Sequence, residues 1–466
     1  MCSTLFRFQN LPFLVFLAYF LVVVHFQKEW IGAPRKFGVD ATSTGVSKVE
    51  ETVQENMEVN DTLIELSDSS INNNSTIKCQ NVEQNDLNVE AQGTEIVQEF
   101  VPVRQVYNFE RGTALELSRR IWSSSMQKQQ YLRGCLWSPD GTCLLTAVNC
   151  DGMHIFELPS DLYKNEPISA ERIPDDLKPA VHVKEGGTVY DYCWYPHMNS
   201  GLPETCCWIA TRQHEPIHMW DAFNGELRCS YKGYDAVDEV EAAISVAFSI
   251  DGEKIIGGYK KNLKVFNTDV PGRDYTEITT KQPISCFAID DSFKDTVAAG
   301  SWNCSINLYD LRIPKLGSLA TFTEHVGGIT FLKFARNGQV LFSGARKDNN
   351  LFEWDMRNFS KPIRVLTRNV NTNQRIYFDV SFGDRFLVSG DTNGDVHVWD
   401  TEENYKEMQV SLHYDCCNGV SFHHSYPILA TTSGQYHFVT DDETNQQIVK
   451  QYENSLIMWW FGDMLL

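Results

Sequence analysis

Short runs of alternating apolar and polar residues dominate the chain from about residue 130 to its end. Turn sequences such as Pro139-Asp140-Gly141, Asp251-Gly252 and Asn393-Gly394 separate these runs. Alternation with period two places apolar side chains on one face of a β-strand, and glycine after aspartate or asparagine is typical of tight turns. The pattern therefore predicts an all-β domain built from many short strands.

The predicted strands repeat as larger units, each marked by a strand that ends in an aromatic residue. The middle units are spaced by 43 to 46 residues, which matches the roughly 40 to 45 residues of a four-stranded propeller blade. Loop insertions at residues 159–178 and 440–455 explain the longer first and last intervals. Seven units predict a seven-bladed WD-repeat β-propeller over residues 101–466. The aromatic positions are Phe156, Trp220, Phe266, Tyr309, Trp354, Trp399 and Trp459.

The unit that ends at Trp354 shows the internal order of a blade best. Residues 329–334, 340–343 and 351–354 predict strands a, b and c. Four polar or indole side chains fall where a WD blade places a hydrogen-bonded tetrad, and buried polar groups need such partners. We therefore assign them a structural role and no chemistry. They are His325, Ser343, Asp348 and Trp354.

A propeller needs its ring to close, because an open ring would leave a strand edge unpaired. Residues 104–109 (RQVYNF) are predicted to be the outer strand of the last blade, paired with residues 456–460. Both ends of the domain would then lock one blade.

Two different segments precede the predicted propeller. Residues 1–35 contain the apolar run Leu11 to Val24, which resembles a signal peptide core or a short signal anchor but falls short of the roughly 20 residues that span a bilayer. A gene-model artefact is the alternative. Within residues 36–100, the stretch 41–100 holds twelve acidic residues against two lysines, and the region has almost no aromatic residues. This composition predicts a disordered acidic region that serves as a solvating spacer, and an acidic interaction motif is the alternative.

Charge and cysteine content restrict the possible ligands and compartments. A formal net charge of −21 gives no general attraction to nucleic acid, so any such binding needs a local basic patch. Thirteen cysteines without paired spacing predict reduced, mostly buried thiols and a cytosolic or nuclear compartment.

Motifs of catalysis and metal binding give no positive signal. No Walker lysine, nucleophile elbow or G-x-G-x-x-G is present, which disfavours an enzyme, and we expect no cofactor. His214 to His218 matches H-E-x-x-H, but Pro216 lies inside it and Trp220-Asp221 follows, so the segment predicts the start of a β-strand. No metal site is predicted.

Basic and aromatic residues collect in the loops that share one face of the predicted propeller, which are the b–c loops and the connections into strand a. The loop at 344–349 and the connection at 371–377 should lie side by side. Such sets bind single-stranded RNA, since planar groups stack on bases and lysines hold phosphates. The alternative is a solvated rim whose side chains only cap loops. The residues are Arg346, Lys347, Asn373, Gln374, Arg375, Tyr377, Arg212, Tyr259, Lys260, Lys261, Trp302 and Tyr436.

Several segments of the chain are more distinctive than a WD dipeptide. They are residues 189–195 (VYDYCWY), 216–228 (PIHMWDAFNGELR), 271–274 (PGRD), 343–348 (SGARKD), 372–379 (TNQRIYFD) and 459–460 (WW). These segments closely resemble the telomerase Cajal body protein family, and the resemblance covers roughly residue 100 to the end. The apolar N-terminus departs from the acidic start expected of the family.

The resemblance implies a nuclear RNA-binding propeller. It would recognise the Cajal-body box in hairpin loops of small Cajal-body RNAs, and of telomerase RNA where present, and direct them to Cajal bodies with other ribonucleoprotein components. Two of the resembling segments lie in the loop patch around Arg346 and Arg375. The alternatives are a protein-only WD-repeat scaffold and a membrane-tethered propeller, because fold alone does not settle function.

Overall fold

The computed structural model describes residues 107–465 apart from 111, 113, 124–127, 165–167, 185–186, 291, 293 and 439–451. The expectations for residues 1–35 and 36–100, and for most of the insertion at 440–455, lie outside the described residues. Over the described residues, no helix is long and apolar enough to cross a membrane.

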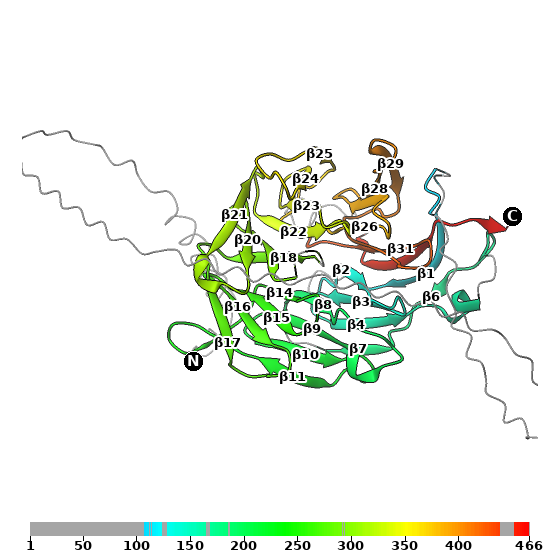
Figure 1. Ribbon diagram of the computed structural model, residues 1–466. Helices are drawn as coiled ribbons and strands as arrows, with labels where there is room; N and C mark the ends of the chain where they lie inside the picture. The colour runs from blue at the N-terminus through cyan, green and yellow to red at the C-terminus, as the bar shows by residue number, and fades with distance from the viewer. Residues whose placement is uncertain are drawn as a thin grey trace, which may run out of the picture. The chain divides into compact units, whose positions relative to one another are not determined.

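Seven sheets, each with four main antiparallel strands, form a β-propeller, which confirms the predicted fold (Figure 1). The first strand of each sheet lies nearest the middle of the ring and the last lies outside. Blades one to three contain β2 Leu132–Trp137, β3 Cys143–Val148, β4 Gly152–Glu157 and β7 Val181–Val183; β8 Val189–Trp194, β9 Cys207–Arg212, β10 Ile217–Asp221 and β11 Leu227–Tyr231; β14 Ser245–Phe248, β15 Lys254–Gly258, β16 Asn262–Asn267 and β17 Tyr275–Thr279.

The remaining blades follow the same order along the chain. Blades four to six contain β18 Ile284–Ile289, β19 Thr296–Ser301, β20 Ser305–Asp310 and β21 Ser318–Thr323; β22 Ile329–Phe334, β23 Val340–Ala345, β24 Asn350–Asp355 and β25 Arg364–Thr367; β26 Phe378–Val380, β27 Phe386–Gly390, β28 Asp395–Asp400 and β29 Lys406–Ser411. Blade seven contains β30 Cys417–Phe422, β31 Ile428–Ser433, β32 Ser455–Trp460 and β1 Leu115–Ile121.

The third strand of every blade carries the aromatic residue that marked the repeat, from Phe156 in β4 to Trp459 in β32. The H-E-x-x-H segment leads into β10, so its second histidine, His218, lies on a β-strand as predicted. Short additional strands decorate the ring. They are β5 Ile168–Ser169, β6 Asp175–Asp176, β12 Gly233–Tyr234, β13 Val240–Glu241 and β33 Met464–Leu465.

The ring closes in blade seven, but with a different segment from the predicted one. The outer strand is β1, which pairs with β32 so that Leu115 opposes Trp460 and Ile121 opposes Ser455. The insertion after β4 adds β6 in parallel on the far edge of β1. The prediction of residues 104–109 as this strand was wrong in position, although the N-terminal part of the domain does complete the last blade.

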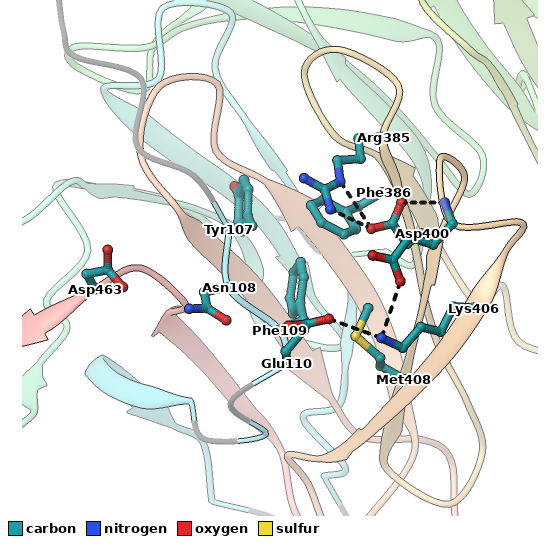
Figure 2. A pocket seen from close by; sticks show the side chains of 11 residues that line it. Tyr107, Asn108, Phe109, Glu110, Arg385, Phe386, Asp400, Lys406, Met408 and Asp463 are labelled. Atoms are coloured by element: carbon teal, nitrogen blue, oxygen red, sulfur yellow. Dashed lines mark hydrogen bonds and ion pairs between the residues drawn. The ribbon is translucent and has the colours of Figure 1, made fainter.

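Residues 107–110 pack against the joint of blades six and seven instead (Figure 2). The Tyr107 hydroxyl lies 3.0 to 3.2 Å from the carbonyl oxygens of His423, Tyr426 and Ile428. The Tyr107 ring stacks on the ring of Phe109 at a centroid distance of 5.5 Å. The pocket of about 300 Å³ beside them is lined by charges that are already paired, such as Lys406 with Glu110 at 3.0 Å. We therefore interpret the pocket as part of the junction between residues 107–110 and blades six and seven, and not as a ligand site.

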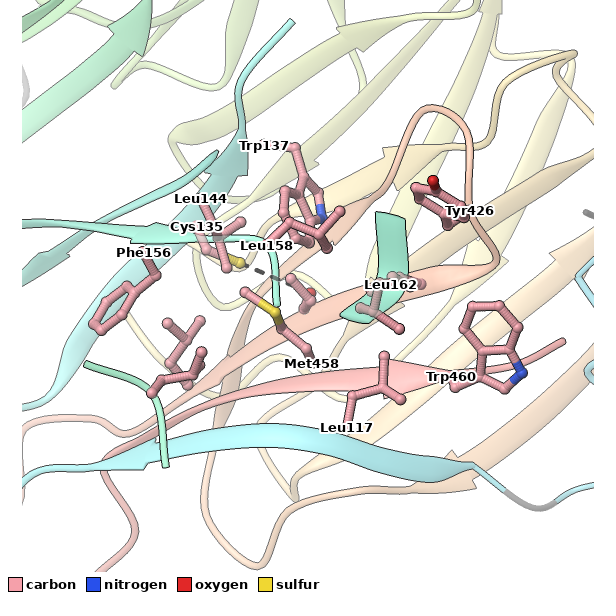
Figure 3. Packing of buried hydrophobic residues seen from close by; sticks show 14 of the residues in the cluster. Leu117, Cys135, Trp137, Leu144, Phe156, Leu158, Leu162, Tyr426, Met458 and Trp460 are labelled. Carbon is pink, nitrogen blue, oxygen red and sulfur yellow. Dashed lines mark hydrogen bonds between the residues drawn. The ribbon is translucent and has the colours of Figure 1, made fainter. Parts of the chain in front are cut away.

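Apolar side chains fill the wedge between each pair of neighbouring blades. At the closing seam, Leu117 from β1 and Met458 from β32 meet Leu144 and Phe156 of blade one, and all four are fully buried (Figure 3). Alternation along each strand sends one set of side chains toward each neighbouring blade, so every blade is buried on both faces. The central strands therefore read as nearly continuous apolar runs.

The predicted tetrad holds blade five together. His325 Nδ1 lies 2.8 Å from an Asp348 carboxylate oxygen, and His325 Nε2 lies 2.8 Å from Ser343 Oγ. Trp354 Nε1 donates to the same Ser343 oxygen at 2.8 Å. The chain of bonds ties the b–c turn to strands b and c, as expected for a structural network.

Candidate nucleic-acid interface

The b–c loops and the connections into the first strand of each blade meet at one mouth of the central channel. The backbone N–H of Lys347, in the b–c loop of blade five, donates to the carbonyl of Thr372 at 3.1 Å. Thr372 belongs to the connection from blade five into blade six. The predicted proximity of these two loops is confirmed.

Arg346 and Trp302 form a pair between the b–c loops of blades four and five. The guanidinium carbon of Arg346 lies 5.4 Å from the centroid of the Trp302 ring, and 48% of Trp302 is exposed. Gly327 lies against the carbonyl of Arg346, where a Cβ would clash with backbone. Burial lowers the pKa of Arg346 below its ordinary value, but an arginine keeps its charge at neutral pH. The pair presents a planar cation and an exposed indole together.

The three lysines that the sequence predicted for this face are exposed. Lys347 occupies a left-handed backbone position with φ of 51° at the tip of its turn. Lys260 and Lys261 lie in the turn between β15 and β16 of blade three. Their location agrees with the sequence analysis and gives an acidic protein a local set of cations.

Arg375 was predicted to lie on this surface, but it points into the channel. Its Nη1 donates to Asp191 Oδ1 at 2.6 Å and to the Tyr377 hydroxyl at 3.2 Å, and its Nη2 donates to the Ser285 carbonyl at 2.8 Å. Asp191 Oδ2 also accepts the backbone N–H of Val246 at 3.1 Å. Burial alone would lower the pKa of Arg375, but the charge of Asp191 raises it. The network joins blades two, three, four and six.

Tyr377 and Tyr259 are not surface residues either. Tyr377 is 5% exposed, and its ring packs where Gly134 lacks a side chain. Tyr259 is fully buried beneath Lys264, whose ammonium lies 4.3 Å from the ring centroid. The prediction that these two rings lie on an accessible rim was wrong, because loop position in the sequence does not show which way a side chain turns.

Gln374 and Asn373 lie in a bridge across the channel mouth. Gln374 Nε2 donates to the carbonyls of Leu132 in blade one and Gly434 in blade seven, both at 3.3 Å. Asn373 is exposed beside it. Since Thr372 contacts Lys347, the segment 372–374 connects the loops of blade five with those of blade seven.

The last two predicted residues are Tyr436, in the loop that follows β31, and Arg212, the last residue of β9. Tyr436, two residues beyond Gly434, is 53% exposed. Arg212 Nη2 lies 3.5 Å from Glu215 Oε1 in the same turn of blade two, so part of its charge is balanced locally. The structure thus brings Trp302, Arg346 and Lys347 to one end of the bridge and Tyr436 to the other.

One group of metal-ligand type was not predicted. Donor atoms of Asp151, His154 and His182 lie within 4.8 Å of one another. Burial, and then the charge of His182, lower the pKa of His154 to about 4, so its ring is neutral at pH 7. The His154 to Asp151 contact of 3.0 Å has a counterpart in blade six, where His397 and Asp391 lie 3.2 Å apart. We therefore interpret it as a tie between turn and strand.

The repeated blades and the hydrogen-bonded tetrad define the class of protein, a WD-repeat β-propeller. A family model described as "WD domain, G-beta repeat" matches residues 317–355, which include all four tetrad residues. The chain is 50% identical to "Telomerase Cajal body protein 1 homolog" of Drosophila melanogaster over 78% of this chain and 71% of that protein. It is 40% identical to "Telomerase Cajal body protein 1" of Homo sapiens over 73% of this chain and 66% of that protein. The chain belongs to the telomerase Cajal body protein family.

Similarity to a relative with a different name is lower. The "Guanine nucleotide-binding protein negative regulator 1" of Schizosaccharomyces pombe is 25% identical over 63% of this chain and 77% of that protein.

Proposed function

We propose that the face formed by Trp302, Arg346, Lys347 and the bridge at 372–374 binds a single-stranded hairpin loop of RNA. On this proposal the protein carries small Cajal-body RNAs, and telomerase RNA where it is present, to nuclear Cajal bodies. The names of its relatives connect them with telomerase and Cajal bodies, and this supports the choice of ligand. Other ribonucleoprotein proteins would be its partners.

The observation that carries the proposal is the contact between the blade-five loop and the bridge. The same region contains an arginine whose guanidinium lies over a tryptophan ring, an exposed lysine and an exposed amide. Arginine planes and aromatic rings stack on unpaired bases, amides bond base edges and lysine ammonium groups hold phosphates. A net charge of −21 would repel RNA at a distance, so binding must depend on this local set.

The test compares Lys347→Glu and Trp302→Ala with the parent chain in fluorescence anisotropy with a box-containing hairpin RNA. Both variants should bind more weakly, and the parent affinity should fall as salt rises because phosphate contacts release counterions. Lys315→Glu is the matched control, since Lys315 is an exposed lysine on the turn between β20 and β21, at the opposite face.

Two outcomes would contradict the proposal in different ways. If Lys347→Glu and Trp302→Ala bind like the parent, the site assignment is wrong. If the parent does not distinguish the box-containing hairpin from one with a mutated loop, a protein-only scaffold is the better interpretation.

A further inference from the structure

Three aromatic side chains project from the loops of blade seven on the same face. Tyr414, between β29 and β30, is 64% exposed, while Tyr436 and Phe438, which follow β31, are 53% and 80% exposed. The rings of Tyr436 and Phe438 meet edge to face at a centroid distance of 4.9 Å. Only Tyr436 was predicted as a site residue.

The backbone beneath these rings is anchored. His437, between Tyr436 and Phe438, turns inward, and its Nε2 lies 2.7 Å from an Asp415 carboxylate oxygen. Its backbone N–H donates to the Gln129 side chain at 2.8 Å, and its carbonyl accepts from the same amide at 2.8 Å. The His437 ring also stacks on Tyr452 at 3.9 Å.

Tyr414 is held in a similar way. Its backbone N–H donates to Glu453 Oε2 at 2.9 Å. Glu453 and Asp415 are both buried and hydrogen-bonded, so the negative charges lie beneath the rings and not at the surface. The outward direction of the three aromatic side chains is therefore a property of fixed loops.

Large exposed aromatic groups on anchored backbone mark a binding surface, because burying them is favourable and the described residues of their loops leave them exposed. We infer that this surface also binds RNA, because it adjoins the proposed RNA face. Gln374 reaches from the bridge to the carbonyl of Gly434, two residues before Tyr436. A strand of RNA that lies along the bridge arrives at these rings.

We propose that Tyr414, Tyr436 and Phe438 form a platform on which an unpaired nucleobase of the bound RNA stacks. This inference rests on the proposed function and assigns it a second contact region, opposite the Arg346 side. Every base has an aromatic face, so the platform selects an unpaired base over a paired one without reading its identity. The alternative occupant, an apolar segment of a partner protein, is an outcome of the test.

The test uses the full chain and a set of box-containing hairpins in which each loop nucleotide in turn is replaced by an abasic residue. Phe438→Ala and Tyr436→Ala should each weaken binding of the intact loop by about 5- to 150-fold, the range for loss of one stacked base. At one abasic position the variants and the parent should bind equally, because the stacking partner is already missing. Phe438→Trp should retain affinity.

Phe223→Ala is the matched control, because Phe223 is 57% exposed on the turn between β10 and β11, at the opposite face. It should bind like the parent. The urea midpoint of Phe438→Ala should equal that of the parent, since a residue that is 80% exposed contributes little to the core.

The two proposals fail separately. If Phe438→Ala and Tyr436→Ala bind as the parent does while Lys347→Glu loses binding, the platform is wrong and the RNA face stands. In that case an apolar segment of a partner protein becomes the better occupant. If the variants lose affinity equally for every abasic loop, the rings contact the RNA without stacking on a loop base, and the platform proposal is wrong. If the parent shows no loop preference, both proposals are overturned.

Discussion

Replacing Arg375 with methionine tests whether this residue stabilises the fold from within the channel or contacts a ligand at the surface. The guanidinium donates three hydrogen bonds, to Asp191, to Tyr377 and to the Ser285 carbonyl, and its side chain is only 16% exposed. Methionine keeps most of the stem volume and removes every donor. The Asp191 side chain, 8% exposed, would then hold a buried charge without its partner.

The expected loss of stability is large. Breaking a buried ion pair by removing one partner costs about 3–5 kcal/mol, against a total of about 5–15 kcal/mol for a folded protein. The exposed pair of Arg273 and Asp238, with a similar separation of 2.8 Å and side chains 61% and 70% exposed, is the matched control. Arg273→Met should cost no more than about 1 kcal/mol.

Urea unfolding followed by tryptophan fluorescence measures both variants, with the midpoint and the slope compared with the parent. Adding Asp191→Asn to Arg375→Met should recover part of the loss, because the orphaned charge is removed. A shift of the Arg375→Met midpoint no larger than that of Arg273→Met would refute the structural interpretation. It would return Arg375 to the set of candidate surface residues.

Two further predictions concern stability. Leu117→Ala, at the closing seam, should lower the free energy of unfolding by about 2–5 kcal/mol because it leaves a cavity between blades seven and one. A shift in urea midpoint as small as that of Arg273→Met would contradict this, because it would show that the neighbouring side chains fill the cavity. Burial opposes ionisation of Asp348, but hydrogen bonds from His325 and from two backbone N–H groups lower the pKa of Asp348. When the pKa of a carboxyl group is lower in the folded protein than in the unfolded chain, the group stabilises the fold at pH values above its unfolded pKa, which is near 4. This stabilisation is lost as the pH falls through the pKa of the folded state. The melting temperature of Asp348→Asn should therefore fall less steeply below pH 4 than that of the parent, and equal slopes would contradict this assignment.

The repeat could be predicted because a WD blade has a characteristic length and places its polar residues at fixed positions. The spacing of the aromatic strands gave seven blades, and the position of His325 relative to Trp354 was enough to expect the tetrad. The closing strand was harder. Apolar and polar residues alternate in residues 104–109 as well as in Leu115–Ile121, so the sequence pattern does not distinguish the two segments. Only the tertiary packing shows that Tyr107 and Phe109 pack against blades six and seven.

The face of the candidate site could be predicted, but the direction of its side chains could not. Loop order along the chain was sufficient to bring Lys347 beside the connection at residue 372. In that same connection Asn373 points to solvent and Arg375 points into the channel. The difference arises from an acidic partner, Asp191, that lies 184 residues away in the sequence.

The inward position of Arg375 also changes how an RNA-binding defect at this residue should be interpreted. Arg375 and Tyr377 lie beneath the bridge, where they join strands of blades two, four and six. A second hollow of about 450 Å³ opens at the opposite mouth of the channel. Phe331 and Lys333 line it, and Tyr377 forms part of its wall. RNA would therefore lie across the mouth and not enter the channel. A variant of Arg375 would weaken binding by releasing the bridge at Gln374, whereas a variant of Lys347 would weaken it by loss of charge. Only the second should reduce the dependence of binding on salt.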